Sequence, residues 1–128
     1  MTTTEEIQLD TPIKTPYGDP EDWDGVMPAS FVEAVAEHLS RLGWTVWDHT
    51  DVAITVLIPI EATGMQAAAK RGDHLSVWWS QTGGFMWAVH EPEHGGQHNN
   101  PNTLPMPSHE HPVYVVASID HLLRHGAN

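Results

Sequence analysis

The chain has 128 residues and a mass of 14.2 kDa, a size typical of one domain with its own hydrophobic core. Its 17 acidic residues outnumber 5 basic ones, and the formal net charge of −12 disfavours direct binding to nucleic acid or anionic membranes, which depends largely on Lys and Arg. The chain has no cysteine, which excludes disulfides and thiolate metal sites, and its longest apolar run, VAITVLIPI, is too short to span a bilayer.

Residues 1–28 have no helical or strand period, and we expect an acidic extended arm before a single α+β domain at 29–126. The arm lacks the basic start and apolar stretch of a secretion signal, so the expected compartment is the cytoplasm. Within DPEDWDG, Trp23 needs a place either in the domain's own core or in a partner's pocket. Trp23, Asp22 and Asp24 are therefore candidate partner-binding residues, the alternative being a solvated tail that docks loosely.

Residues 31–42 predict an amphipathic helix, because apolar side chains recur there at helical spacing. Ser30 followed by Glu33 matches a capping box at the start of this helix. Gly43 is suited to the position just after its C-terminus.

Two strands are predicted next, at about 44–48 and 52–58, joined by the turn-prone residues 49–51. The second strand is apolar on both faces, which favours a central place in the sheet, and Pro59 ends it. Residues 61–73 fit either a short helix or an ordered loop.

The segment HLSVWWSQTGGFMWAVH predicts a β-hairpin with its turn at 81–84. A loop of even length pairs Trp78 with Trp87, and strand alternation then places Trp78, Phe85 and Trp87 on one face. This aromatic face is either covered by the domain's own helices and arm or exposed as the anchor of a protein interface.

Residues 91–111 form a long loop of His, Asn, Gly and Pro without any period. Candidate ligands for Zn²⁺ or Ni²⁺ in and around it are His90, His94, His98, His109 and His111. The letters HEPEH match the zincin pattern H-E-x-x-H, but Pro92 within it and two following glycines prevent the helix that this pattern requires. The HEPEH match therefore does not indicate a metalloprotease.

The chain closes with a predicted helix at 112–125, which Pro112 begins and Gly126 ends. The β-branched run VYVV leaves a strand followed by a short helix as the alternative. Together these elements predict an α+β fold, with an antiparallel sheet of about four strands and the N-terminal and C-terminal helices packed on one face.

The sequence favours a non-enzymatic protein-interaction module, namely an adaptor, inhibitor or assembly component, that binds through the aromatic sheet face and the acidic surface. The partner is expected to be a protein, and a basic or nucleic-acid-binding one fits an acidic protein that mimics DNA. The alternative is a metal- or small-molecule-binding domain that uses the histidine-rich loop, with a small hydrolase as a third hypothesis. The lysine-poor composition, rich in Ala, Trp and His, is typical of high-GC bacteria and their phages.

Overall fold

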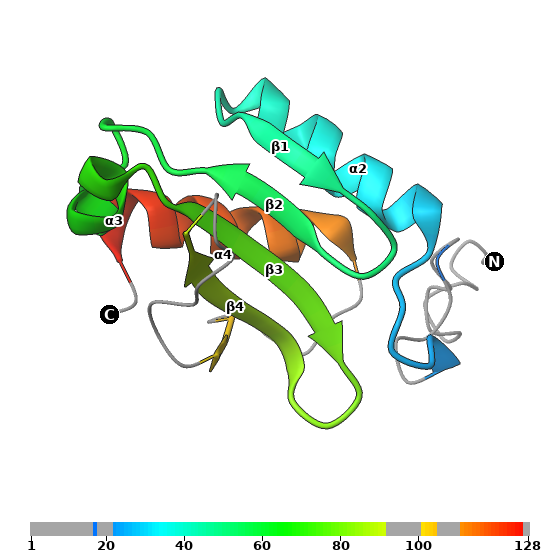
Figure 1. Cartoon of the computed structure of the whole chain (residues 1–128). Helices are drawn as coiled ribbons and strands as arrows, with labels where there is room; N and C mark the ends of the chain where they lie inside the picture. Colours follow the sequence, from blue (N-terminus) through cyan, green and yellow to red (C-terminus); the bar gives the residue numbers. More distant parts are fainter. Residues whose placement is uncertain (1–16, 18–21, 92–100, 105–110, 127–128) are drawn as a thin grey trace, which may run out of the picture.

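The computed structural model describes residue 17 and residues 22–91, 101–104 and 111–126. Along the chain the elements are α2 (Ala29–Arg41), β1 (Val46–His49), β2 (Ile54–Leu57), η2 (Thr63–Met65), α3 (Gln66–Arg71), β3 (His74–Ser80), β4 (Gly84–His90), β5 (Asn102–Thr103) and α4 (Pro112–His125). The strands form one antiparallel sheet in the order β1-β2-β3-β4-β5 (Figure 1). The α+β architecture is as predicted, with five strands instead of about four.

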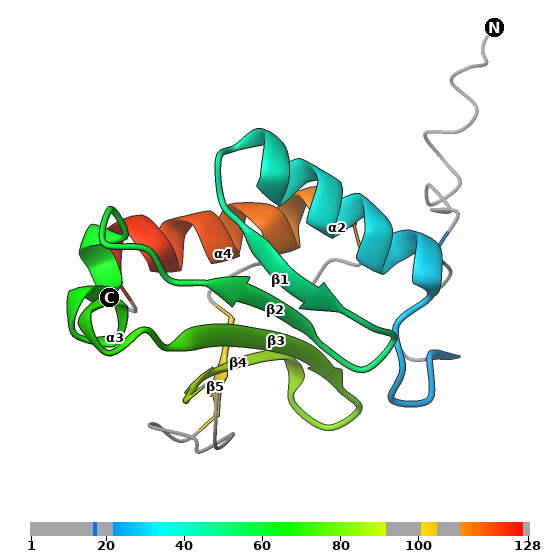
Figure 2. The same cartoon turned by 45° about the horizontal axis from the view of Figure 1, so that its top comes forward.

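Helices α2 and α4 pack against each other and lie on one side of the sheet (Figure 2). The sheet residues turned toward them define the inner face, and they are Ile54, Val56, Leu75, Val77, Phe85, Trp87 and Val89. The helix residues in the same core are Phe31, Val32, Val35, Leu39, Val115, Val116, Ile119, Leu122 and Leu123. Burial of this apolar surface is the main term that stabilises the fold. Among the described residues, no helix combines the length and apolar character that crossing a bilayer requires.

Helix α2 ends in a Schellman motif, as the position of Gly43 predicted. Gly43 adopts a φ of 98°, and its N–H donates to the Ser40 carbonyl, while the Trp44 N–H donates to the Leu39 carbonyl. The start of the helix differs from the prediction. Pro28 is the N-cap residue and no side chain caps the helix, so the capping box expected from Ser30 is absent.

Helix α4 confirms the predicted C-terminal helix and excludes the strand alternative at its start. Its last turn meets η2 at very close range. The Thr63 hydroxyl donates to the Arg124 carbonyl at 2.8 Å, and a Cβ on Gly64 would lie 2.6 Å from the carbonyl carbon of His125. Only glycine fits at position 64 without a shift of backbone.

The strand β2 lies between β1 and β3 and alternates buried and half-buried residues, which confirms its predicted central place. The fifth strand, β5, lies within the segment that the sequence assigned to a long loop. It pairs with Met86 and Trp87 of β4, and the next residue, Leu104, is buried and donates its N–H to the Phe85 carbonyl at 2.8 Å. The remainder of that loop, at 92–100 and 105–110, lies outside the described residues.

The β3–β4 hairpin is present, but its predicted register is wrong by one residue. Three residues, not an even number, connect Ser80 to Gly84, which adopts a φ of 77°. Trp79 consequently pairs with Phe85, and Trp78 pairs with Met86. Because side chains alternate along a strand, a one-residue change places Trp78 on the opposite face from Phe85 and Trp87.

Candidate protein-interaction surface

Three of the aromatic residues predicted to bind a partner belong to the domain's own core. Trp23, Phe85 and Trp87 are only 7%, 5% and 6% exposed. The Trp23 ring meets Phe31 edge-on with 4.9 Å between centroids, and Phe31 stacks on Phe85 at 5.7 Å. The sequence left open whether the sheet face with Phe85 and Trp87 is covered or exposed, and the structure shows that the domain itself covers both rings.

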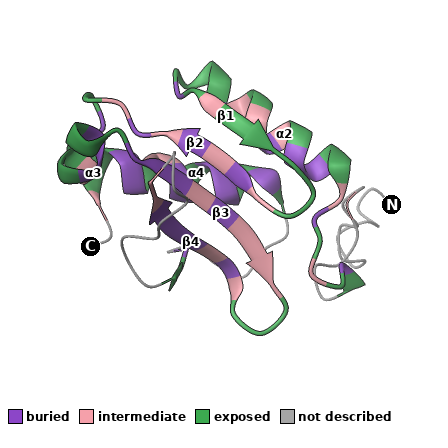
Figure 3. Ribbon diagram, in the orientation of Figure 1, coloured by how far each residue is buried: buried purple, intermediate pink, exposed green. Residues whose placement is uncertain are grey.

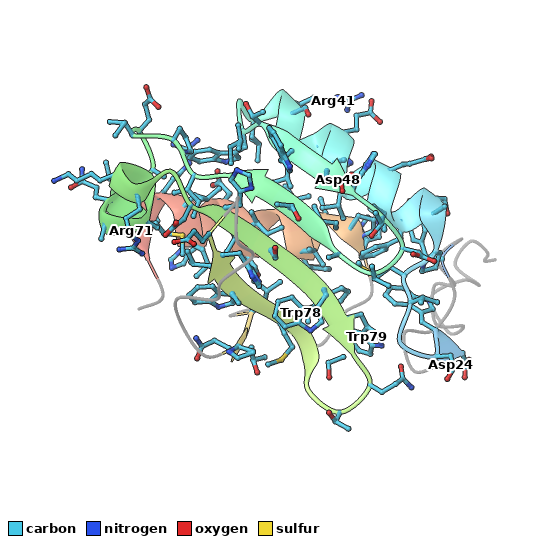
Figure 4. The ribbon with its side chains drawn as sticks, in the orientation of Figure 1. Asp24, Arg41, Asp48, Arg71, Trp78 and Trp79 are labelled. Carbon is cyan, nitrogen blue, oxygen red and sulfur yellow. The ribbon has the colours of Figure 1, made fainter. Side chains whose placement is uncertain are left out.

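The other predicted partner-binding residues are accessible but separated. Trp78 is half-buried on the outer face of the sheet, which is the face turned away from α2 and α4 (Figure 4). Asp22 and Asp24 are exposed in the turn that precedes α2, where Asp24 adopts a φ of 56°. The structure therefore does not gather the six predicted residues into one site.

The predicted metal ligands are only partly described. His90 is half-buried at the end of β4, opposite His74 of β3, whereas His111 is exposed at the N-cap of α4, where its Nδ1 accepts from the Val113 N–H at 3.2 Å. His94, His98 and His109 lie outside the described residues. Within the part of the chain that the structure describes, no three His, Asp or Glu side chains are grouped so as to hold a metal ion.

A groove of about 470 Å³ runs between α2 and β1. Its helix wall comes from Glu33, Ala36, Glu37 and Ser40, and its strand wall from the consecutive residues Val46, Trp47, Asp48 and His49. The helix residues follow one another at spacings of three, one and three, which places them in one stripe along α2. Helix α2 and strand β1, which supply the two walls, lie side by side (Figures 1 and 2).

Trp47 is the most accessible aromatic side chain among the described residues that line the groove. It is 64% exposed, although neighbouring Trp44 is only 7% exposed (Figure 3 shows the exposed residues along β1). The register of β1 with β2 shifts between Val46 and Asp48, so Trp47 is the extra residue of a β-bulge. Bulges redirect side chains, and here the bulge coincides with a large, mainly exposed indole.

The Trp47 ring lies over His74, with 5.1 Å between ring centroids and 43° between planes. His74 is itself only 7% exposed. Burial lowers the pKa of the His74 imidazole below its ordinary 6.5, and the neighbouring Asp73 carboxylate partly opposes that shift. The ring beneath Trp47 is therefore held in its neutral form near neutral pH.

Carboxylates line both walls of the groove: Glu33 and Glu37 on α2, and Asp48 on β1. Arg41, one turn after Glu37, forms an ion pair with it. Both side chains of that pair are more than 60% exposed, and such surface pairs contribute only about 0–1 kcal/mol. Neither wall carries a Lys or Arg among its lining residues, so these residues have a net negative charge, which Arg41 partly offsets at Glu37 (Figure 4 labels Asp48 and Arg41).

Sequence reasoning missed this groove. Two signals pointed toward it: the polar stripe of α2 opposite its apolar face, and a tryptophan followed by Asp48 in a short strand. Neither signal shows that the stripe and the strand lie side by side, because their contact depends on tertiary packing. No family model, curated protein or solved structure matches the chain.

Proposed function

We propose that the chain is a non-enzymatic protein-interaction module that binds a basic partner protein in the groove between α2 and β1. The observation that carries this proposal is a groove at the β1 edge with carboxylates on both walls, next to a strand whose Trp47 indole is 64% exposed on the outer face of the sheet. A tryptophan is among the residue types that most often anchor protein interfaces.

The negative charge of the chain supports the proposal that the partner is basic. The chain has a net charge of −12, and three of its carboxylates line the groove. Complementary charge accelerates encounter and discriminates against acidic partners. A partner that ordinarily binds nucleic acid has the required basic surface, so this proposal includes the inhibitor that mimics DNA.

Trp47 can interact with a basic side chain directly. A guanidinium or ammonium group over the face of an indole gains about 0.5–1 kcal/mol at an exposed site, and more where water is excluded. A second Lys or Arg of the partner, turned toward α2, can cover Ala36 and Val46 with its aliphatic stem.

The test is fluorescence anisotropy with a labelled synthetic peptide in which lysine and valine alternate, compared with the corresponding glutamate and valine peptide. We expect the protein to bind the basic peptide and not the acidic one, with an affinity that falls as salt is added. The groove variant Glu33→Gln/Asp48→Asn should weaken this binding about tenfold, since two partly screened charge pairs are lost.

The matched control is Asp22→Asn/Asp24→Asn, which removes the same charge from exposed residues outside the groove. We expect this control to change the affinity less than about twofold. Equal weakening by both variants would show that net charge, and not the groove, attracts the peptide. Absence of any preference for the basic peptide would refute the proposed function.

A further inference from the structure

We infer that the groove receives a short extended basic segment of the partner, which adds to the sheet as a further strand along β1. This inference rests on the proposed function and specifies the conformation of the bound segment. Its physical basis is the location of the groove at an edge of the sheet.

Strand β1 is one of the two edges of the sheet, and it forms one wall of the groove. In an antiparallel ladder only alternate residues of an edge strand exchange backbone hydrogen bonds with the neighbouring strand, so the other N–H and C=O groups face outward. An extended segment in the groove can pair with those groups, which is the recognition mode called β-augmentation.

The opposite edge is less suited to this mode. Strand β5 consists only of Asn102 and Thr103, whereas β1 has four residues and adjoins the groove. Four residues in a strand span about 13 Å. The bulge at Trp47 increases the local twist and limits regular pairing, so the added segment is short, about four to six residues.

The geometry also determines which groups the side chains of the added segment contact. Val46 belongs to the inner-face side of β1 and packs against the core, whereas Trp47 contacts His74 on the outer face. Alternate side chains of an added strand therefore face either α2, with Glu33 and Glu37, or the outer face near Trp47 and Asp48. A segment in which basic and small apolar residues alternate turns all its Lys or Arg side chains to one of these sides, and each side offers carboxylates.

The test adds one peptide to the previous pair: the lysine and valine peptide methylated at every internal amide nitrogen. Methylation leaves the positive charges in place but removes the backbone donors that strand pairing needs. We expect affinity to fall at least tenfold relative to the unmethylated peptide. Backbone amides of Val46–His49 should also exchange more slowly with solvent deuterons, by NMR, when the unmethylated peptide is bound, whereas those of β5 should not change.

The outcomes separate the two proposals. If both basic peptides bind equally and the β1 amides gain no protection, strand addition is wrong, while binding of a basic partner stands. If neither basic peptide binds better than the acidic one, the proposed function itself fails. Loss of affinity on methylation together with protection confined to β1 supports the inference.

Discussion

Replacing Trp87 by alanine should destabilise the protein much more than replacing Trp78 by alanine, because the observed register places the two side chains on opposite faces of the sheet. Trp87 is 6% exposed and lies in the core. A buried aromatic side chain removes about 150–250 Å² from water, which corresponds to about 4–6 kcal/mol at 25 cal/mol per Å². Measured losses for such truncations are about 3–5 kcal/mol, and we expect a value in that range.

Trp78 is a matched control, since it is the same residue type on the neighbouring strand. It is half-buried and pairs with Met86 on the outer face, so we expect a loss of only about 1–2 kcal/mol. The assay is urea denaturation followed by circular dichroism, with comparison of the free energies of unfolding. Because domains are stable by only about 5–15 kcal/mol, Trp87→Phe provides a milder variant if Trp87→Ala does not fold.

Equal losses for the two alanine variants would contradict the observed register. They are the result expected from the even-length turn, which places Trp78 and Trp87 on the same face. A larger loss at Trp78 would indicate that the outer face is the better-packed one, and would remove the reason for locating the core beneath α2 and α4.

Three further predictions concern the groove, the junction of η2 with α4, and the response to pH. Trp47→Ala should change the free energy of unfolding, measured by urea denaturation, by less than about 1 kcal/mol, because the indole is mainly exposed. The same variant should weaken binding of the lysine and valine peptide, measured by anisotropy, about tenfold. Gly64→Ala should lower the free energy of unfolding by about 1–3 kcal/mol or more, because its Cβ would collide with backbone atoms of His125 and Gly126. Thermal denaturation measures this loss, and an unchanged melting temperature would contradict the close approach. The pKa of His74 is lowered by burial in the folded state, so the unfolded chain binds the proton more readily, and stability should be greatest above pH 6.5 and fall as pH drops through the folded-state pKa. His74→Gln should flatten that fall in urea midpoints compared between pH ~7.5 and ~5, and an unchanged slope would exclude His74 as its source.

The elements that the sequence predicted correctly are those specified by local signals. Helical spacing over 31–42 and a glycine at position 43 are sufficient for α2 and its Schellman end. Pro112 and Gly126 likewise bracket α4. In each case the residues that define the element are within a few positions of one another, so no knowledge of the rest of the fold was needed.

Features that depend on a single residue of spacing or on distant contacts were not predicted. The turn before Gly84 has three residues, and this difference alone reversed the assignment of Trp78. Strand β5 has only two residues, and pairing with β4 together with the buried Leu104 places it in the sheet. Trp23 was recognised as a residue that needs a pocket, but only the fold identifies that pocket as the domain's own core.

The same features that would admit the proposed basic segment at β1 oppose edge-to-edge pairing between two copies of the chain. An exposed edge strand is a template for association, and proteins limit that risk with short edges, bulges and charged side chains. Strand β1 has four residues, a bulge at Trp47, and a carboxylate at Asp48, and the helix wall adds Glu33 and Glu37. Two copies meeting edge to edge would bring these carboxylates together, whereas a basic segment neutralises them. Specificity is a difference between affinities, and in this groove the repulsion of a second copy and the proposed attraction of a basic partner would arise from the same side chains.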